Sequence, residues 1–220
     1  MNEQEIAALV GKIIAEQCGP NGCYQPEGDD MIVPIGVSNR HIHLSSADFE
    51  QLFGVGAEMT HFKDLSQPGQ FACKEVMTLV GPGGAIERVR LLGPARKQTQ
   101  VEVSVADCFK LGVRAPLRDS GDLAGSSPIT IVGPKGSIYL EEGCIIALKH
   151  IHMHTDDAAR LGLKDKDHVN VQTCGERNLM FQEVLIRVSD KFKLEMHIDM
   201  DEANAASLTN GDKVRIVGKC

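Results

Sequence analysis

Two short His-x-His motifs have the clearest chemical potential in this sequence of 220 residues. His41 and His43 form the first motif, and His150 and His152 form the second, in the other half of the chain. In an extended strand, side chains at positions i and i+2 project from the same face, roughly 6 to 7 Å apart along the backbone. Both imidazoles of a motif can therefore reach one metal ion.

Each His-x-His motif has one further ligand-type residue in an equivalent place. The segment QVEVSVADC at 100–108 aligns with EMHIDMDEA at 195–203, and Glu102 then stands opposite His197. A repeat of this kind indicates an internal duplication. Imidazole and carboxylate groups bind zinc, and three protein ligands with an open fourth position are typical of a catalytic site. A single motif would be weak evidence, but the matched pair predicts two metal sites, formed by His41, His43 and Glu102 and by His150, His152 and His197.

The other three histidines of the sequence lack such a match. His61 and His168 stand alone, whereas His154 extends the second motif to a third alternating histidine. His154 has two interpretations, a spare ligand or a polar residue beside a helix cap at Thr155. We favour the second, and we expect none of the three histidines to bind metal.

Two adjacent divalent cations would bind an anionic substrate or a bridging oxygen, and would polarise a carbonyl group or hold phosphate oxygens. Arg96 lies six residues before Glu102, and Ser38 and Arg40 flank the first motif. These side chains are candidates for anion binding. Arg96 would share a face with Glu102 if one strand carried both residues, and the Gly-Pro and turn potential of this stretch leave a break in the strand as the alternative.

A second candidate for anion binding is the segment PLRDSGDLAGSS at 116–127. Its small and hydroxyl residues are typical of a loop whose backbone N–H groups cradle an anion, with Arg118, Ser120 and Gly121 as contributors. The same composition is equally typical of a plain turn.

The elements that must position these residues are mostly short strands. After Met31, β-type runs alternate with turns that contain glycine. Two VGPxG segments, at 80–84 and 132–136, predict hairpin loops, and SSADFEQLFG and HTDDAARLG predict short helices after the two motifs. The pattern favours two duplicated small β-barrel domains over a doubly wound sheet. The predicted strands include MIVPIGV, VMTLVGPGGAIERVRLLGP, TQVEVSV, ITIVGPKGSIYL, CIIALKHIHM, HVNVQT, LMFQEVLIRV, LEMHIDM and KVRIVG.

The N-terminal segment differs in character. Residues 4–17 place apolar side chains at helical spacing, which predicts an amphipathic helix, and CGPNGCYQPEGDD then predicts a linker. Such a helix either packs on its own domain or docks its apolar stripe into a groove of another protein.

Composition excludes several classes of function. The formal net charge is −7, whereas a nucleic-acid surface requires clustered cations, and the absence of Trp leaves few platforms for base stacking. No apolar run is long enough to span a membrane, and the acidic N-terminus is unlike a secretory signal. The seven cysteines form no C-x-x-C pair, so reduced thiols and a cytoplasmic protein are expected.

Five motifs in order, SNRHIHLS, LLGPARKQTQVEVS, APLRDSGDLAGS, ALKHIHM and LEMHIDMDEANAA, resemble the phosphate propanoyltransferase (phosphotransacylase) family of bacterial microcompartments, of the propanediol-utilisation type. The resemblance runs from about residue 31 to the C-terminus. It implies reversible acyl transfer between coenzyme A and phosphate, a homodimer, and two β-barrel domains that exchange strands. The implied domains are 39–148 and 149–220, the latter completed by strand 29–38.

The resemblance also implies roles for particular residues. Two divalent metal ions, expected to be zinc, fall on the same six ligands that the repeat predicts, and Arg96, Ser38 and Ser120 match family positions near the phosphate. The segment 1–28 resembles an encapsulation peptide, which implies recruitment to the shell or cargo of a microcompartment in the cytoplasm. His154 and Thr155 depart from the family pattern, in which Ser or Thr and then Pro are usual.

The mechanism expected from these residues is direct attack of phosphate on the thioester, with phosphate bound by the metals and Arg96. Covalent chemistry at Cys108 is a minor alternative, because nothing in the sequence places a base beside it. Two other functions stay open: a metal-dependent hydrolase or thioesterase, and a non-catalytic, metal-stabilised protein that binds a shell. Acetyl and propanoyl groups differ by one methylene, so the sequence does not decide between them.

Overall fold

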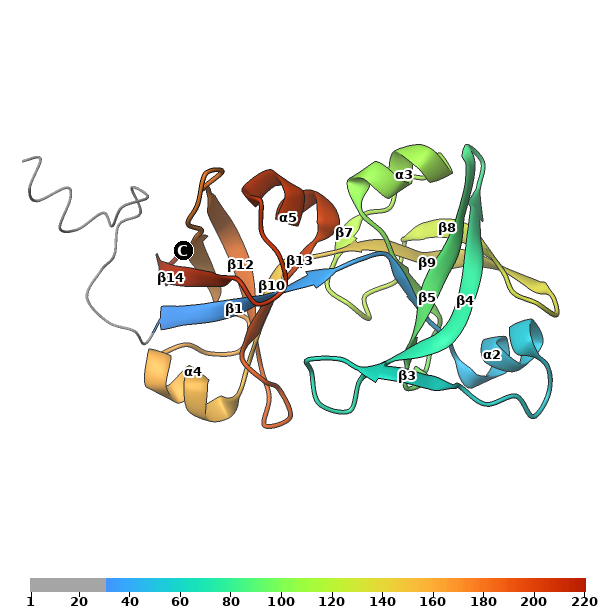
Figure 1. The fold of residues 1–220 in the computed structure, drawn as a ribbon, viewed down its shortest axis with the longest axis horizontal. Coiled ribbons are helices and arrows are strands. Elements are labelled where there is room, and N and C mark those ends of the chain that lie inside the picture. Colours follow the sequence, from blue (N-terminus) through green and yellow to red (C-terminus); the bar gives the residue numbers. More distant parts are fainter. Residues whose placement is uncertain (1–30) are drawn as a thin grey trace, which may run out of the picture.

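Runs of alternating apolar residues form β-strands, which make up the largest part of the regular structure in residues 31–220. The computed structural model describes residues 31–220, in which the strands form two barrels side by side (Figure 1). The N-terminal helix predicted for residues 4–17 lies outside the described residues. Within residues 31–220 the fold is mainly β with short helices, as the sequence predicts.

The first barrel contains most of the strands from the first half of the chain. Strands β4, β5, β2, β6, β9 and β8 pair in this order, and β8 closes the ring because it pairs with both β9 and β4. Strand β3 adds to β4, and β7 adds to β9. The bounds are β2 His41–His43, β3 His61–Asp64, β4 Phe71–Gly81, β5 Gly84–Gly93, β6 Gln100–Glu102, β7 Leu117–Arg118, β8 Ser127–Val132 and β9 Ser137–Ala147.

The second barrel is closed in the order β1, β13, β10, β12, β11 and β14. The second barrel repeats the parallel and antiparallel strand pairs of the first barrel when β1 is matched with β9 and β10 with β2. The duplication seen in the sequence is therefore also present in the topology. The bounds are β1 Ile32–Ser38, β10 His150–Met153, β11 His168–Gln172, β12 Met180–Val188, β13 Glu195–Asp199 and β14 Lys213–Lys219.

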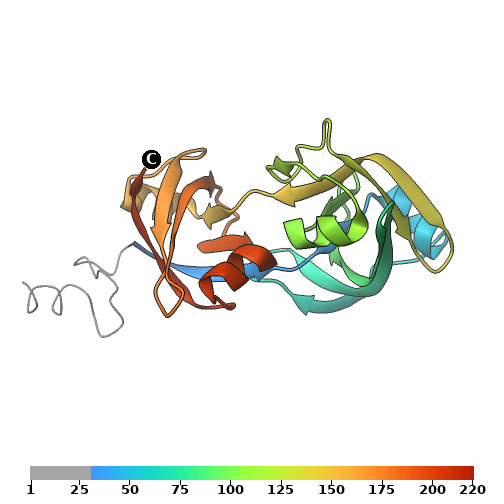
Figure 2. The same ribbon diagram turned by 90° about the horizontal axis from the view of Figure 1, so that it is seen from above.

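The two halves of the chain exchange their first strands. Strand β1 precedes β2 in sequence but lies in the second barrel, and β9 precedes β10 but lies in the first (Figure 2). Between residues 31 and 220 the chain therefore crosses from one barrel to the other twice, at 38–41 and at 147–150. Each His-x-His motif begins where a crossing ends, and this brings both motifs to the region between the barrels.

Four short helices follow ligand-bearing strands: α2 (Ser46–Phe53), α3 (Val105–Leu111), α4 (Thr155–Leu161) and α5 (Met200–Ala206). Helices α2 and α4 confirm the prediction. The prediction of continuous strand through TQVEVSV and LEMHIDM is wrong at its C-terminal ends, because Ser104 with Asp107, and Asp199 with Glu202, form capping boxes that start α3 and α5. None of the helices in residues 31–220 is long and apolar enough to cross a membrane.

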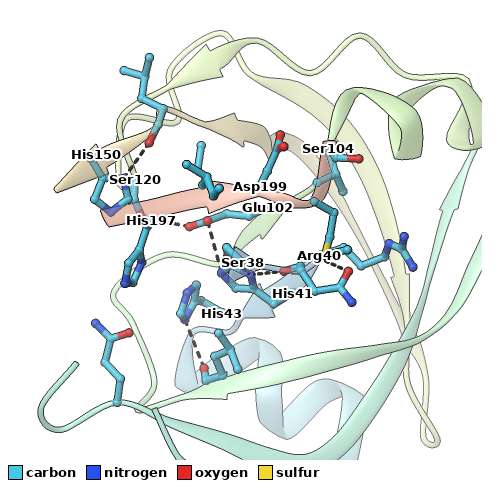
Figure 3. A pocket seen from close by; sticks show the side chains of 18 of the residues that line it. Ser38, Arg40, His41, His43, Glu102, Ser104, Ser120, His150, His197 and Asp199 are labelled. Atoms are coloured by element: carbon cyan, nitrogen blue, oxygen red, sulfur yellow. Dashed lines mark hydrogen bonds and ion pairs between the residues drawn. The ribbon is translucent and has the colours of Figure 1, made fainter. Parts of the chain in front are cut away.

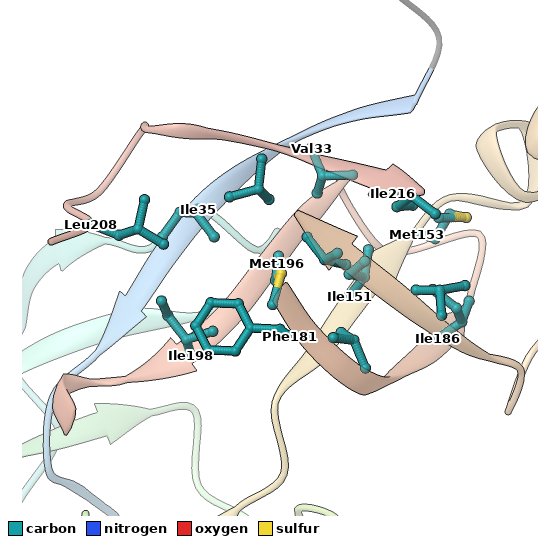
Figure 4. Packing of buried hydrophobic residues seen from close by; sticks show 14 of the residues in the cluster. Val33, Ile35, Ile151, Met153, Phe181, Ile186, Met196, Ile198, Leu208 and Ile216 are labelled. Atoms are coloured by element: carbon teal, nitrogen blue, oxygen red, sulfur yellow. The ribbon is translucent and has the colours of Figure 1, made fainter. Parts of the chain in front are cut away.

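Each barrel encloses its own apolar core, and the cores hold the ligand strands in place. Ile151, fully buried between His150 and His152, packs in the core of the second barrel (Figure 4). Ile42 has the same position between His41 and His43 in the first barrel. Because successive side chains of a strand point to opposite faces, a buried Ile turns the histidine on each side of it toward the other face. Burial of each Ile contributes about 1.5 to 3 kcal/mol to this anchoring.

Both predicted hairpins are confirmed. Gly81 pairs with Gly84 between β4 and β5, and Val132 pairs with Ser137 between β8 and β9. The hairpins lie at the ends of long strands of the first barrel, away from the motifs (Figure 1). They stabilise the scaffold and take no part in the site.

Candidate active site

A single pocket brings the six predicted ligands together. It is lined by both crossings, by the ends of β6 and β13 and by the Ser120 loop. Figure 3 shows His41, His43 and His197 facing the same space, with Glu102 above them. Residues from both barrels form this pocket, and the two segments that cross between the barrels lie in its wall.

The six residues form two clusters of three. In each cluster, one ligand-type atom from every member lies within 4.8 Å of those of the other two. The pairing of strands is equivalent in the two barrels, because His41 is opposite Glu102 and His150 is opposite His197. The alignment of the two sequence segments is thereby confirmed. The clusters are His41, His43 and Glu102, and His150, His152 and His197.

Backbone carbonyls fix the orientation of three imidazoles. Nδ1 of His41 donates to the carbonyl of Asn39 at 2.8 Å, and Nδ1 of His150 donates to the carbonyl of Leu148 at 2.7 Å. Nδ1 of His43 lies 3.2 Å from the carbonyl oxygen of Leu92. With the proton on Nδ1, Nε2 of each ring has a free lone pair when the ring is neutral. Such an outer hydrogen bond is the usual support for a histidine that binds a metal.

The second cluster has an arrangement of nitrogens that suits a cation. Nε2 of His150 and Nε2 of His152 are 3.1 Å apart, and Nδ1 of His152 is buried without a hydrogen-bond partner. If His152 carries its proton on Nδ1, two lone pairs face each other and a buried N–H lacks an acceptor. A cation bound by these imidazoles would remove the repulsion, and the residues present therefore fit a divalent metal ion.

Burial keeps most of these imidazoles neutral, the form that binds metals. Burial lowers the pKa of His43 and of His152 to about 2 and that of His150 to about 4, and neighbouring imidazoles add to each effect. Burial also lowers the pKa of His41, but the Glu102 carboxylate at 3.3 Å outweighs it, and the pKa is raised overall. The pKa of Glu102 is lowered, because attraction to His41 exceeds the effect of burial.

A cation and a hydroxyl lie next to the first cluster. Nη1 of Arg96 donates to Oγ of Ser120 at 3.0 Å, and Oγ of Ser120 donates to Oε1 of Glu102 at 3.1 Å. Gln100 also donates to both Ser120 and Glu102, at 2.8 and 2.6 Å. Arg96 and Ser120 both line the pocket, so a guanidinium and a hydroxyl face the space beside the metal ligands. This combination suits an oxyanion such as phosphate.

Only some of the other residues predicted to bind an anion line the pocket. Ser38 lines the pocket, with Oγ 3.5 Å from Nδ1 of His41. Arg118 does not line it; Nε of Arg118 lies 3.7 Å from a carboxylate oxygen of Asp122. The N–H of Gly121 donates to the side-chain oxygen of Gln100 and so is not free to bind an anion. Of the loop candidates, the structure places Ser120 in the pocket.

Three residues near the clusters were not predicted from the sequence. Arg187 on β12 lines the pocket, and Nη1 of Arg187 lies 3.6 Å from Asp119. Gln100 and Glu195, each two residues before a third ligand, bond to Glu102 and His197. The sequence did contain a signal for this last pair, because the same alignment that matched the ligands also places Gln100 opposite Glu195.

The histidines expected not to bind metal lie outside both clusters. His61 pairs with Asp64 at 2.7 Å, and His168 is on β11. His154 is itself the N-cap of α4, where its ring accepts from the N–H of Asp156, so the cap lies one residue before the expected Thr155. Cys108 is buried in the first core and does not line the pocket. Burial raises the pKa of its thiol, which makes Cys108 a poor nucleophile.

Comparison with known proteins identifies the family. The model of the phosphate propanoyltransferase family matches residues 34–209. The chain belongs to the phosphate propanoyltransferase family. A phosphate propanoyltransferase of Thermotoga maritima is 60% identical over 184 residues, which are 83% of this chain and 88% of the relative.

Two further relatives extend over nearly the full length. A phosphate propanoyltransferase of Rhodopseudomonas palustris is 48% identical over 100% of this chain and 99% of its own length. One of Priestia megaterium is 54% identical over 96% and 95%. At this identity and coverage the chain is an enzyme, a phosphate acyltransferase, and the non-catalytic interpretation of the sequence is set aside.

Proposed function

We propose that the enzyme transfers a short acyl group reversibly between coenzyme A and inorganic phosphate at a two-metal site, with propanoyl as the main group and acetyl as a second. The observation that carries the proposal is the pocket in which two three-residue clusters lie beside the guanidinium of Arg96. Its members are those expected to hold two zinc ions, which would polarise the thioester carbonyl and phosphate oxygens.

The residues of the pocket have distinct tasks in this reaction. Arg96 binds phosphate, and the hydroxyl groups of Ser120 and Ser38 orient it. A phosphate oxygen attacks the carbonyl carbon of the thioester, the carbon–sulfur bond breaks, and the proton of hydrogen phosphate passes to the departing thiolate. The products are acyl phosphate and free coenzyme A.

Release of free thiol from propanoyl-CoA tests this function. Wild type loaded with zinc should release thiol only when phosphate is present, and His41→Ala should lose the phosphate-dependent release. Release that is indifferent to phosphate would mean a thioesterase or another metal-dependent hydrolase. The same assay with acetyl-CoA measures the preference for acyl chain, for which a one-methylene difference is worth about 1 to 3 kcal/mol.

Isotope exchange distinguishes direct attack from a covalent acyl-enzyme. An acyl-cysteine at Cys108 would exchange labelled coenzyme A into propanoyl-CoA without phosphate. Direct attack predicts no exchange until phosphate is added. The burial and raised thiol pKa of Cys108 support the direct route.

We also propose a homodimer that is recruited to the shell or cargo of a bacterial microcompartment through segment 1–28. On α3, the side chains of Val105 and Phe109 are exposed by 49% and 84%, which supports an apolar surface for self-association. Removal of residues 1–28 should leave turnover unchanged and abolish recruitment. Loss of bound metal from the truncated protein would contradict the separation of this segment from the catalytic part.

A further inference from the structure

Glu195 makes a short contact with a predicted metal ligand. Its Oε2 lies 2.6 Å from Nε2 of His197, and the Glu195 side chain is only 12% exposed. If Nε2 carries the proton and donates to this carboxylate, Nδ1 is the nitrogen of His197 that remains for the metal. His197 would then bind through the opposite nitrogen from His41, His43 and His150.

The first barrel contains the matching contact with reversed chemistry. Gln100 is opposite His43 on the paired strand, as Glu195 is opposite His152. Gln100 donates from Nε2 to Oε1 of Glu102 at 2.6 Å. A carboxylate ligand thus has an amide donor behind it, and an imidazole ligand has a carboxylate acceptor behind it. In both barrels the supporting residue stands two positions before the third ligand, on the same strand and face.

Contacts from both barrels hold Glu195 in place. Ser66, in the loop between β3 and β4, donates to Oε2 of Glu195. Gln67 of the same loop is 2% exposed, donates to the carbonyl of Lys193 at 2.9 Å and accepts from the N–H of Lys193 at 3.2 Å. Gly36 of β1 closes the remaining side, since a Cβ there would be 2.8 Å from Cδ of Glu195. A carboxylate held by Ser66 and packed closely against β1 is suited to orient an imidazole.

We propose that Glu195 is the positioning residue of the second metal cluster, that it holds His197 with Nδ1 directed at the ion, and that Gln100 has the corresponding task for Glu102. The inference rests on the proposed two-metal function. A carboxylate that accepts from the outer nitrogen of a ligating histidine fixes its tautomer and raises its basicity, and its loss usually weakens metal binding by about 10- to 100-fold.

Titration of the metal-free protein with Co²⁺ against a competing chelator tests the proposal without any turnover. Glu195→Gln should weaken one of the two binding steps by about 10-fold or more, with a changed visible spectrum of the bound Co²⁺, and Glu195→Ala should weaken it further. His197→Ala identifies the step that belongs to the second cluster. Gln100→Ala should weaken the other step and leave this one unchanged.

Asp64→Asn is the matched control, because it removes a carboxylate that pairs with the exposed His61, at 2.7 Å, outside the clusters. It should leave both binding steps as in wild type. Equal affinities of wild type and Glu195→Gln for both ions would overturn the proposal, as would a structure of the metal-loaded protein with Glu195 bound directly to an ion. If Glu195→Ala does not fold, the Gln variant decides. Wild type that binds no ion would instead contradict the proposed function.

Discussion

Replacement of Gly36 by alanine tests how closely the second barrel packs around the metal ligands. A Cβ at this position would lie 2.8 Å from Cδ of Glu195, 2.9 Å from Oε2 and 3.1 Å from Cδ2 of His197. The closest contact is about 0.6 Å shorter than the lower bound of an ordinary contact, 3.4 Å. The carboxylate of Glu195 and the ring of His197 must therefore move away from β1.

Such a movement alters the 2.6 Å contact between Glu195 and His197. Overpacking of a fixed site costs about 1 to 3 kcal/mol. We expect Gly36→Ala to lose about this much free energy of unfolding. We also expect it to bind the ion of the second cluster about 10-fold more weakly, because loss of a hydrogen bond to the outer nitrogen of a metal ligand weakens metal binding by at least that factor. The assays are urea unfolding of the metal-free protein and titration with Co²⁺.

Gly218→Ala is the control for this experiment. Gly218 is on β14, which is paired with β1 in the same barrel, and apart from its chain neighbours no atom of residues 31–220 lies within 4 Å of a Cβ built there. It should change neither stability nor metal affinity by more than a small amount. If Gly36→Ala also behaves like wild type, the close packing of Glu195 and His197 against β1 is refuted.

Three further predictions follow from charges in and near the pocket. Arg96→Ala should lower kcat/KM for phosphate by about 10- to 150-fold in steady-state assays, because a hydrogen bond to a charged group contributes about 1.5 to 3 kcal/mol; an unchanged value would remove Arg96 from phosphate binding. Binding of zinc to the metal-free protein at pH 6 should release a proton from His41, whose pKa the Glu102 carboxylate raises in spite of burial, and His41→Ala should lower the release measured in weak buffer. Burial raises the pKa of Glu202 to about 7, so the folded state keeps a proton that the unfolded chain has lost, and stability falls as the pH rises from about 4.5 to 7. Glu202→Gln should therefore gain up to about 3 kcal/mol at pH 8 and little at pH 4, measured by urea unfolding; an equal gain at both pH values would contradict this origin.

The duplication made much of the site predictable from sequence. The His-x-His motifs predicted which face of each strand carries the ligands. The alignment of the two later segments predicted Glu102 and His197 as the third ligands, because each is opposite the first histidine of its motif in the paired strand. The order of the strands in the barrels could not be worked out in this way. It depends on β1 and β9 pairing with the opposite half, and local periodicity carries no information about the partner of a strand.

Three other features of the fold and the site were not predicted from the sequence, each for a different reason. The alternation in TQVEVSV predicted a strand through Val105, whereas Ser104 and Asp107 form a capping box that ends the strand and starts α3. Arg187 lies in an apolar strand run, and its position beside His152 depends on the parallel pairing of β10 and β12. Glu195 was not predicted because the alignment that places it opposite Gln100 does not show its contact with His197.

The most direct test of the central claim is the rate of thiol release from propanoyl-CoA as a function of the number of zinc ions bound per chain, with and without phosphate. We predict no phosphate-dependent release from the metal-free protein and full release only with two ions bound. Equal phosphate-dependent rates in the metal-free and loaded protein would contradict the account, because His41, His150 and their partners would then have no part in the reaction as metal ligands.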